Sequence, residues 1–147
     1  MAKYPTFFTP DERAEIESAI QQAELLTSGE IRVHLEDHCD HRPHDRAAFI
    51  FEQLHMHETA ERNGVLFYLA VCDHRFAVIG DIGIHQRVGQ DFWEELCKDL
   101  EQHLRSGHPK DGLIQAILKV GKSLSEAFPR QADDRNELDD TISMGKL

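Results

Sequence analysis

Residues 64–83 read GVLFYLAVCDHRFAVIGDIG and contain the longest continuous apolar run of an otherwise polar chain. Residues 65–71 are apolar at every position, which a strand tolerates when both of its faces are covered. Residues 72–75 then interrupt the run, and residues 76–79 resume it. The simplest interpretation is a central buried strand followed by a tight antiparallel hairpin. The hairpin ends in Gly80-Asp81-Ile82-Gly83, whose two glycines allow a sharp turn, so this loop is the first candidate site.

Upstream of this core, the sequence predicts a helix, a strand and a second helix. Thr9, Pro10 and Glu12 combine an N-cap, a first-turn proline and a capping box, and apolar residues at three- and four-residue spacing follow them. Residues 30–36 alternate apolar and polar side chains, as in a strand with one buried face. A helix is expected from residue 46 to about residue 62. Strand, helix and strand in this order predict a βαβ unit with parallel strands.

Downstream of the hairpin, two long amphipathic helices are expected, at about residues 86–105 and 111–128. Residues 129–147 are polar and acidic, with isolated apolar residues, and are expected to form a flexible tail or to lie along the surface. The predicted organisation is therefore one domain at residues 1–128 followed by this tail. The predicted fold class is α/β, a three-layer α/β/α sandwich in which helices flank a mixed sheet made of the βαβ unit and the hairpin.

Composition limits the class of partner. A chain of 147 residues with a formal net charge of −11 and no cluster of Lys or Arg does not suit a nucleic-acid backbone, whereas divalent cations suit it. Three cysteines without C-x-x-C spacing suggest reduced thiols and a cytoplasmic location. No stretch approaches the ~20 apolar residues of a membrane span, and the N-terminus lacks the apolar region of a signal peptide.

Four short motifs carry a family resemblance. They are Ser28-Gly29-Glu30-Ile31, Arg62-Asn63-Gly64-Val65-Leu66, Asp73-His74-Arg75 and Gly80-Asp81-Ile82-Gly83. With the helices around them, they cover nearly all of residues 9–128 and resemble the TPM domain family. The resemblance implies a Rossmann-like α/β/α sandwich, the weak acid-phosphatase activity linked to several members, and binding of Ca²⁺ or Mg²⁺. Many members carry a signal peptide and a membrane anchor, and neither is visible here, so a soluble member without an anchor is expected.

The strand directions gather candidate ligands at one end of the sheet. We expect three carboxylates to converge there as oxygen ligands for Ca²⁺ or Mg²⁺. They are Asp81 on its glycine loop, Glu30 beside it and Asp91 at the start of a long helix. Arg62 and Asn63 belong to the same end and are candidate binding residues. The structural alternative is that Asp81 terminates a strand and Asp91 complements a helix dipole.

A second candidate site, rich in histidine, is expected at the opposite end. Its potential donors are His34, Asp37, His38, Cys39, Asp40, His41 and His44. His38, His41 and His44 are the candidate ligands for a transition metal such as Zn²⁺, Ni²⁺ or Cu²⁺. Their spacing matches no specific zinc template, so the alternative is a solvated loop that binds metal adventitiously. His34 is interpreted as an ordinary residue on the polar face of its strand.

Two functions from different classes fit these features. The first is a TPM-domain protein with little or no catalysis that binds divalent cations, or a protein partner, through its acidic end. The second is a weak metal-dependent phosphomonoesterase, which needs a metal-activated water and cationic groups on the phosphate. The candidate cationic groups for contacting the phosphate are Arg62, Arg75 and Arg87. The sequence contains no Walker loop, G-x-G-x-x-G or G-x-S-x-G motif, so a conventional nucleotide-binding or hydrolase assignment has no support and no organic cofactor is expected.

Overall fold

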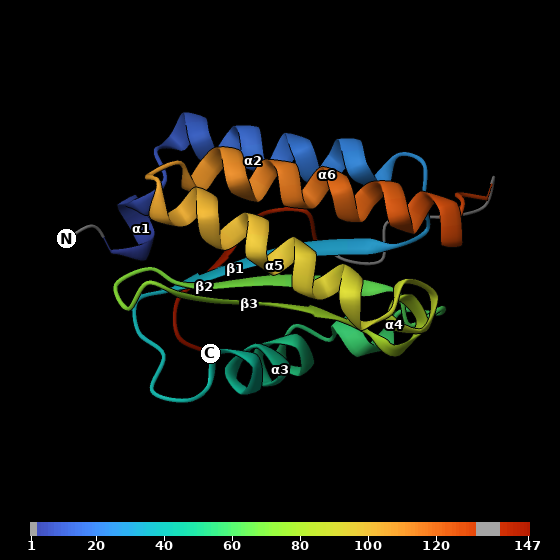
Figure 1. Cartoon of the computed structure of the whole chain (residues 1–147), viewed down its shortest axis with the longest axis horizontal. Coiled ribbons are helices and arrows are strands. Elements are labelled where there is room, and N and C mark those ends of the chain that lie inside the picture. The colour runs from blue at the N-terminus through green and yellow to red at the C-terminus, as the bar shows by residue number, and fades with distance from the viewer. Residues whose placement is uncertain (1–2, 132–138) are drawn as a thin grey trace.

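A mixed sheet lies at the centre of the fold (Figure 1), in a computed structural model that describes residues 3–131 and 139–147. Within these residues its strand order is β3-β2-β1-β4. The strands are β1 (Glu30–Glu36), β2 (Gly64–Ala70), β3 (Arg75–Gly80) and β4 (Ser143–Met144). β1 runs parallel to β2 and β3 runs antiparallel to it, which confirms the predicted βαβ unit and hairpin.

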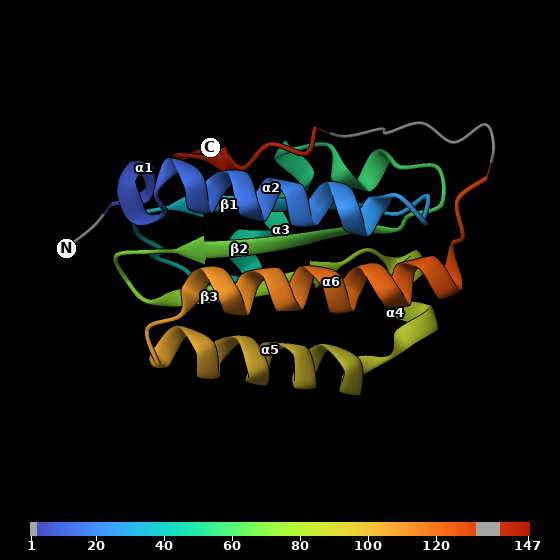
Figure 2. The same ribbon diagram turned by 90° about the horizontal axis from the view of Figure 1, so that it is seen from above.

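Helices cover both faces of the sheet (Figures 1 and 2). One layer contains α2 (Pro10–Glu24), α5 (Gln90–Arg105) and α6 (Pro109–Ala127). The other contains α3 (Pro43–Gln53) and the 3₁₀ turn η1 (Met56–Glu58), while the short helices α1 (Tyr4–Phe7) and α4 (Ile82–Val88) lie at the ends of the sheet. In the part of the chain that the structure describes, no helix has both the length and the apolar character needed to cross a membrane.

The central strand β2 is buried on both faces, as its unbroken apolar sequence predicts. Val65, Phe67 and Leu69 pack with the core beneath α2, α5 and α6. Leu66 and Tyr68 pack instead with the core beneath α3. Each of these five side chains is at most 3% exposed, and burying one apolar side chain of this size contributes about 2 kcal/mol. The three-layer sandwich is thereby confirmed.

Two predicted helices are shorter than expected, because left-handed residues interrupt them. The helix expected at residues 46–62 ends at Gln53, and His55 takes a left-handed conformation, with φ 59°, before η1. The helix expected at residues 86–105 is divided into α4 and α5 by Gly89, with φ 79°. Neither break disturbs the apolar spacing in the sequence, so periodicity alone did not show them.

The last described residues form a strap, residues 139–147, along the outer edge of β1 (Figure 2). β4 pairs parallel with β1, placing Ser143 opposite His34, and the Gly145 N–H donates to the Leu35 carbonyl over 2.8 Å. Ile142 is only 6% exposed. The region expected to be a flexible or surface-lying tail therefore includes an edge strand, too short to be recognised by its pattern. Residues 132–138 of that region lie outside the described residues.

Candidate functional site

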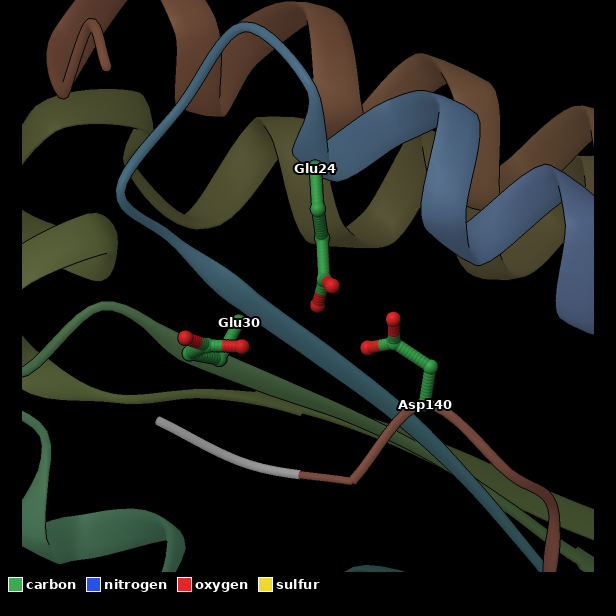
Figure 3. Close-up of side chains that lie close together, drawn as sticks. All are labelled: Glu24, Glu30 and Asp140. Atoms are coloured by element: carbon green, nitrogen blue, oxygen red, sulfur yellow. The ribbon is translucent and has the colours of Figure 1, made fainter. Parts of the chain in front are cut away.

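Three carboxylates from three separate segments meet at one end of the sheet (Figure 3). Glu24 is the last residue of α2, Glu30 is the first residue of β1, and Asp140 lies in the strap. One oxygen of each lies within 4.8 Å of the others. Within residues 3–131 and 139–147, no other group of three or more His, Cys, Asp or Glu side chains is so arranged. These three residues are named the carboxylate cluster below.

The backbone holds the cluster in a largely buried position. Glu24 is 6% exposed and Glu30 is 2% exposed. The Ile31 N–H donates to Glu24 Oε2 over 2.8 Å, so the start of β1 holds the Glu24 side chain in position. Arg130 donates to the Glu24 backbone carbonyl over 3.2 Å. The cluster borders a cavity of about 290 Å³, which Arg130 also lines.

Burial raises the pKa of Glu24 well above the ordinary value for a glutamic acid. The hydrogen bond with Asp140 and the nearby charge of Glu30 act in the same direction, whereas the bond from the Ile31 N–H opposes them. The raised pKa favours the protonated form of Glu24, whose carboxyl shares a hydrogen bond with Asp140. A cation bound between the carboxylates would replace that proton as the positive charge of the cluster.

The residues predicted as ligands at this end are only partly brought together. Glu30 belongs to the carboxylate cluster, while Asp81 and Asp91 lie outside it. Asp81 accepts two hydrogen bonds from Arg62, at 2.8 and 2.9 Å, and caps α4 through the Ile82 N–H. Asp91 is exposed in the first turn of α5, where it complements the helix dipole. Both aspartates thus occupy the positions of the structural alternative.

Asn63 joins the starts of β1 and β2. Its side-chain amide donates to Ser28 Oγ over 3.2 Å. Its backbone carbonyl accepts a hydrogen bond from the Glu30 N–H over 3.4 Å. It is 1% exposed. Of the two candidate binding residues, Asn63 therefore holds Glu30 in position through its hydrogen bonds. Arg62 forms an ion pair with Asp81.

The histidine-rich loop lies beside the hairpin turn, at the end of the sheet opposite the carboxylate cluster. His38 Nδ1 lies 2.8 Å from Asp73 Oδ1, and this hydrogen bond raises the pKa of His38 above its ordinary value. His41 and His44 do not join His38 in any group of three potential ligands among the described residues. The fold therefore does not assemble the predicted set of three histidines.

His34 differs from its interpretation as an ordinary polar-face residue. Its side chain is fully buried, stacks on Tyr68 with ring centroids 6.3 Å apart, and lies 2.8 Å from Ser143 Oγ. Burial lowers the pKa of His34, which favours the neutral imidazole. The strap covers this residue, and alternation in β1 alone could not reveal that cover.

Comparisons with known proteins bear on the family and the fold of the chain. A family model of the TPM domain matches residues 1–123. The chain belongs to the TPM domain family. The NMR structure of the BA42 protein from the psychrophilic bacterium Bizionia argentinensis is 43% identical, with a TM-score of 0.89, and the match covers 99% of this chain and 100% of that one. A search of curated proteins found no match.

Two more distant solved structures show the same fold. The N-terminal domain of the cg2496 protein from Corynebacterium glutamicum is 14% identical with a TM-score of 0.65, covering 82% of this chain and 76% of that one. The N-terminal domain of a protein from P. gingivalis is 18% identical with a TM-score of 0.69, covering 85% of this chain and 81% of that one. At these identities the likeness concerns the fold alone.

Two members of the carboxylate cluster were not among the predicted ligands. Glu24 lies four residues after Ile20 and eight after Ile16, on the apolar stripe of α2, and a carboxylate on a buried stripe is a usable signal. Asp140 offered no such signal, because it lies in the acidic region after α6. It also lies beyond residues 1–123, which the TPM family model matches.

Proposed function

We propose that this TPM-domain protein binds a divalent cation through Glu24, Glu30 and Asp140. The observation that carries the proposal is the approach of three carboxylates within 4.8 Å, two of them buried. Buried carboxylates that approach so closely repel one another unless a proton or a cation neutralises them. A divalent cation supplies that charge and accepts oxygen ligands from all three side chains.

Calcium fits this arrangement better than magnesium. Ca²⁺ accepts six to eight oxygens in flexible geometry, whereas Mg²⁺ requires a near-ideal octahedron and usually keeps several waters. The three carboxylates come from a helix end, a strand and the strap, and such separate segments adapt more readily to a large, tolerant ion. Water and backbone carbonyls would supply the remaining oxygens.

Calorimetric titration with Ca²⁺ tests this function on the full chain. The test variant is Asp140→Asn, which keeps the side chain's shape and removes its charge. The matched control is Asp91→Asn, which makes the same charge change at an exposed carboxylate outside the cluster. We expect one site in the wild type, at least a tenfold weaker site in Asp140→Asn, and wild-type affinity in Asp91→Asn. Equal affinities in all three proteins would reject the proposed site.

A weak metal-dependent phosphomonoesterase is the second candidate function. It is supported by Arg130, a cationic side chain that lines the same cavity as the carboxylates, and the matching family model carries the word phosphatase in its name. A bound cation would activate water, and Arg130 would neutralise phosphate charge. Hydrolysis of p-nitrophenyl phosphate in Mg²⁺ should fall in both Asp140→Asn and Arg130→Gln. Activity that is absent, or unchanged in both variants, would remove this candidate.

A further inference from the structure

The outer edge of β1 is a binding surface that the strap already occupies. An edge strand exposes unpaired backbone groups that pair readily with another extended segment. Here the strap supplies that segment: β4 pairs with His34 and Leu35, and the Gly145 N–H donates to the Leu35 carbonyl over 2.8 Å. The regular ladder spans only two residues of the strap. The backbone attachment is therefore short enough for side-chain contacts to decide whether the strap stays bound.

Side chains of the body recognise successive positions of the strap. Ile142 is 6% exposed, and its N–H donates to Glu17 Oε2 over 3.0 Å. Ser143 Oγ lies 2.8 Å from Nδ1 of the fully buried His34. Gly145 takes a left-handed conformation, with φ 97°, that other residues rarely adopt. The surface thus selects an apolar residue, then a small hydroxyl residue, then glycine two positions later.

We propose that this edge of β1 is a strand-addition site for an extended peptide segment of that chemistry, and that the strap is its resident competitor. In this mode of recognition, backbone hydrogen bonds provide affinity and the side-chain contacts provide specificity. The partner is a protein segment with the order apolar, hydroxyl, any residue, glycine, added parallel to β1. The closed strap blocks the site, and a partner gains access when the strap leaves. The strap also carries Asp140 of the proposed cation site, so a bound cation would oppose its release, and the binding experiment uses the metal-free protein.

The test uses full-length variants whose strap cannot stay bound. Ile142→Asp places a charge in the buried position. Gly145→Pro removes the N–H that donates to the Leu35 carbonyl, and proline cannot adopt the left-handed conformation. The probe is a fluorescent peptide with the sequence of residues 139–147, DDTISMGKL. The control peptide carries Asp in place of Ile and Pro in place of Gly. Hydrogen exchange of β2 amides checks that each variant keeps its core.

We expect saturable binding of the probe to both variants, measured by fluorescence anisotropy. Binding to the wild type should be at least tenfold weaker, because its own strap occupies the edge, and the control peptide should bind neither variant. Probe binding should restore exchange protection along the outer edge of β1. The proposal is overturned if the probe binds no variant, if it binds the wild type equally well, if both peptides bind alike, or if the strap amides stay protected in both variants.

Discussion

Glu24 is the residue whose protonation would control cation binding at the proposed site. Its burial and its bond with Asp140 favour the neutral acid, whereas a metal ligand must be ionised. In the proposed site, proton and cation would therefore compete for the same position. Of the cluster, sequence reasoning selected only Glu30, because Glu30 opens a strand at the predicted end of the sheet. The side chains that complete the cluster come from α2 and the strap, whose packing on β1 is a tertiary feature.

Calcium affinity should rise with pH. The folded-state pKa of Glu24 is raised, so the proton competes at every pH below that raised value, and each bound ion releases this proton. One released proton corresponds to about a tenfold gain in affinity per pH unit. Calorimetry at pH 6, 7 and 8 measures the gain. Glu24→Gln should bind more weakly and lose this pH dependence, whereas a pH-independent wild-type affinity would show that Glu24 is not a ligand.

Asp81 should prove to be a structural residue. Asp81→Ala removes the N-cap of α4 and one partner of Arg62, and loss of such a cap costs about 1 kcal/mol. Urea unfolding should show this loss of stability while Ca²⁺ affinity stays at the wild-type value. Asp91→Ala, at an exposed position, is the control and should change stability by less. A larger loss of Ca²⁺ affinity in Asp81→Ala than in Asp140→Asn would return the cation site to the glycine loop.

At the scale of elements, the position of α2 links core packing to the cluster. Gly121 of α6 faces Ala23 of α2, and a Cβ added at Gly121 would lie 2.6 Å from the Ala23 Cβ. The helices can approach this closely only because Gly121 has no side chain. Ala23 directly precedes Glu24, so any shift of α2 at this contact moves a carboxylate of the cluster.

Gly121→Ala should therefore affect both stability and cation binding. Overpacking costs about 1–3 kcal/mol, and the better helix propensity of alanine offsets up to about 1 kcal/mol of it. Chemical denaturation should show a net loss, and calorimetry should show weaker Ca²⁺ binding. Lys122→Ala, exposed on the same helix, should show neither effect. If Gly121→Ala matches Lys122→Ala in both measurements, α2 and α6 are not closely packed here.

The elements themselves were largely predictable, and their ends were not. The unbroken apolar sequence of β2 requires cover on both faces, which predicted the layers. The order strand, helix, strand predicted the parallel pairing of β1, and the polar break at residues 72–75 predicted the hairpin. The breaks at His55 and Gly89 depend on left-handed backbone conformations, which leave apolar spacing unchanged. β4 was missed because a two-residue strand carries no readable alternation, and its pairing depends on the free edge of β1.

At the scale of the whole molecule, a formal charge of −11 attracts divalent cations without any specific site. Specific binding must be separated from this diffuse attraction. In thermal unfolding at fixed ionic strength, Ca²⁺ at ~100 times its dissociation constant should stabilise the wild type by about 2.7 kcal/mol. Asp91→Asn should show the full rise in Tm and Asp140→Asn little of it. Equal shifts in all three proteins would mean diffuse binding only.

The carboxylate cluster also connects residues 1–123, which the TPM family model matches, to the strap. Glu24 and Glu30 lie within residues 1–123, and Asp140 lies beyond them. A cation bound by all three would attach the strap to the body three residues before the contact of Ser143 with His34. The position of the bound cation therefore decides whether Glu24, Glu30 and Asp140 form the site.

A crystal structure of the full chain grown in Ca²⁺ makes that measurement most directly. We expect an ordered ion with oxygens of Glu24, Glu30 and Asp140 at about 2.3–2.6 Å, the usual range for Ca²⁺ ligands. Asp81 should remain paired with Arg62 in the same crystal. An ion bound at Asp81 or in the histidine-rich loop, with Glu24 still bonded to Asp140, would rule out the carboxylate cluster as the cation site.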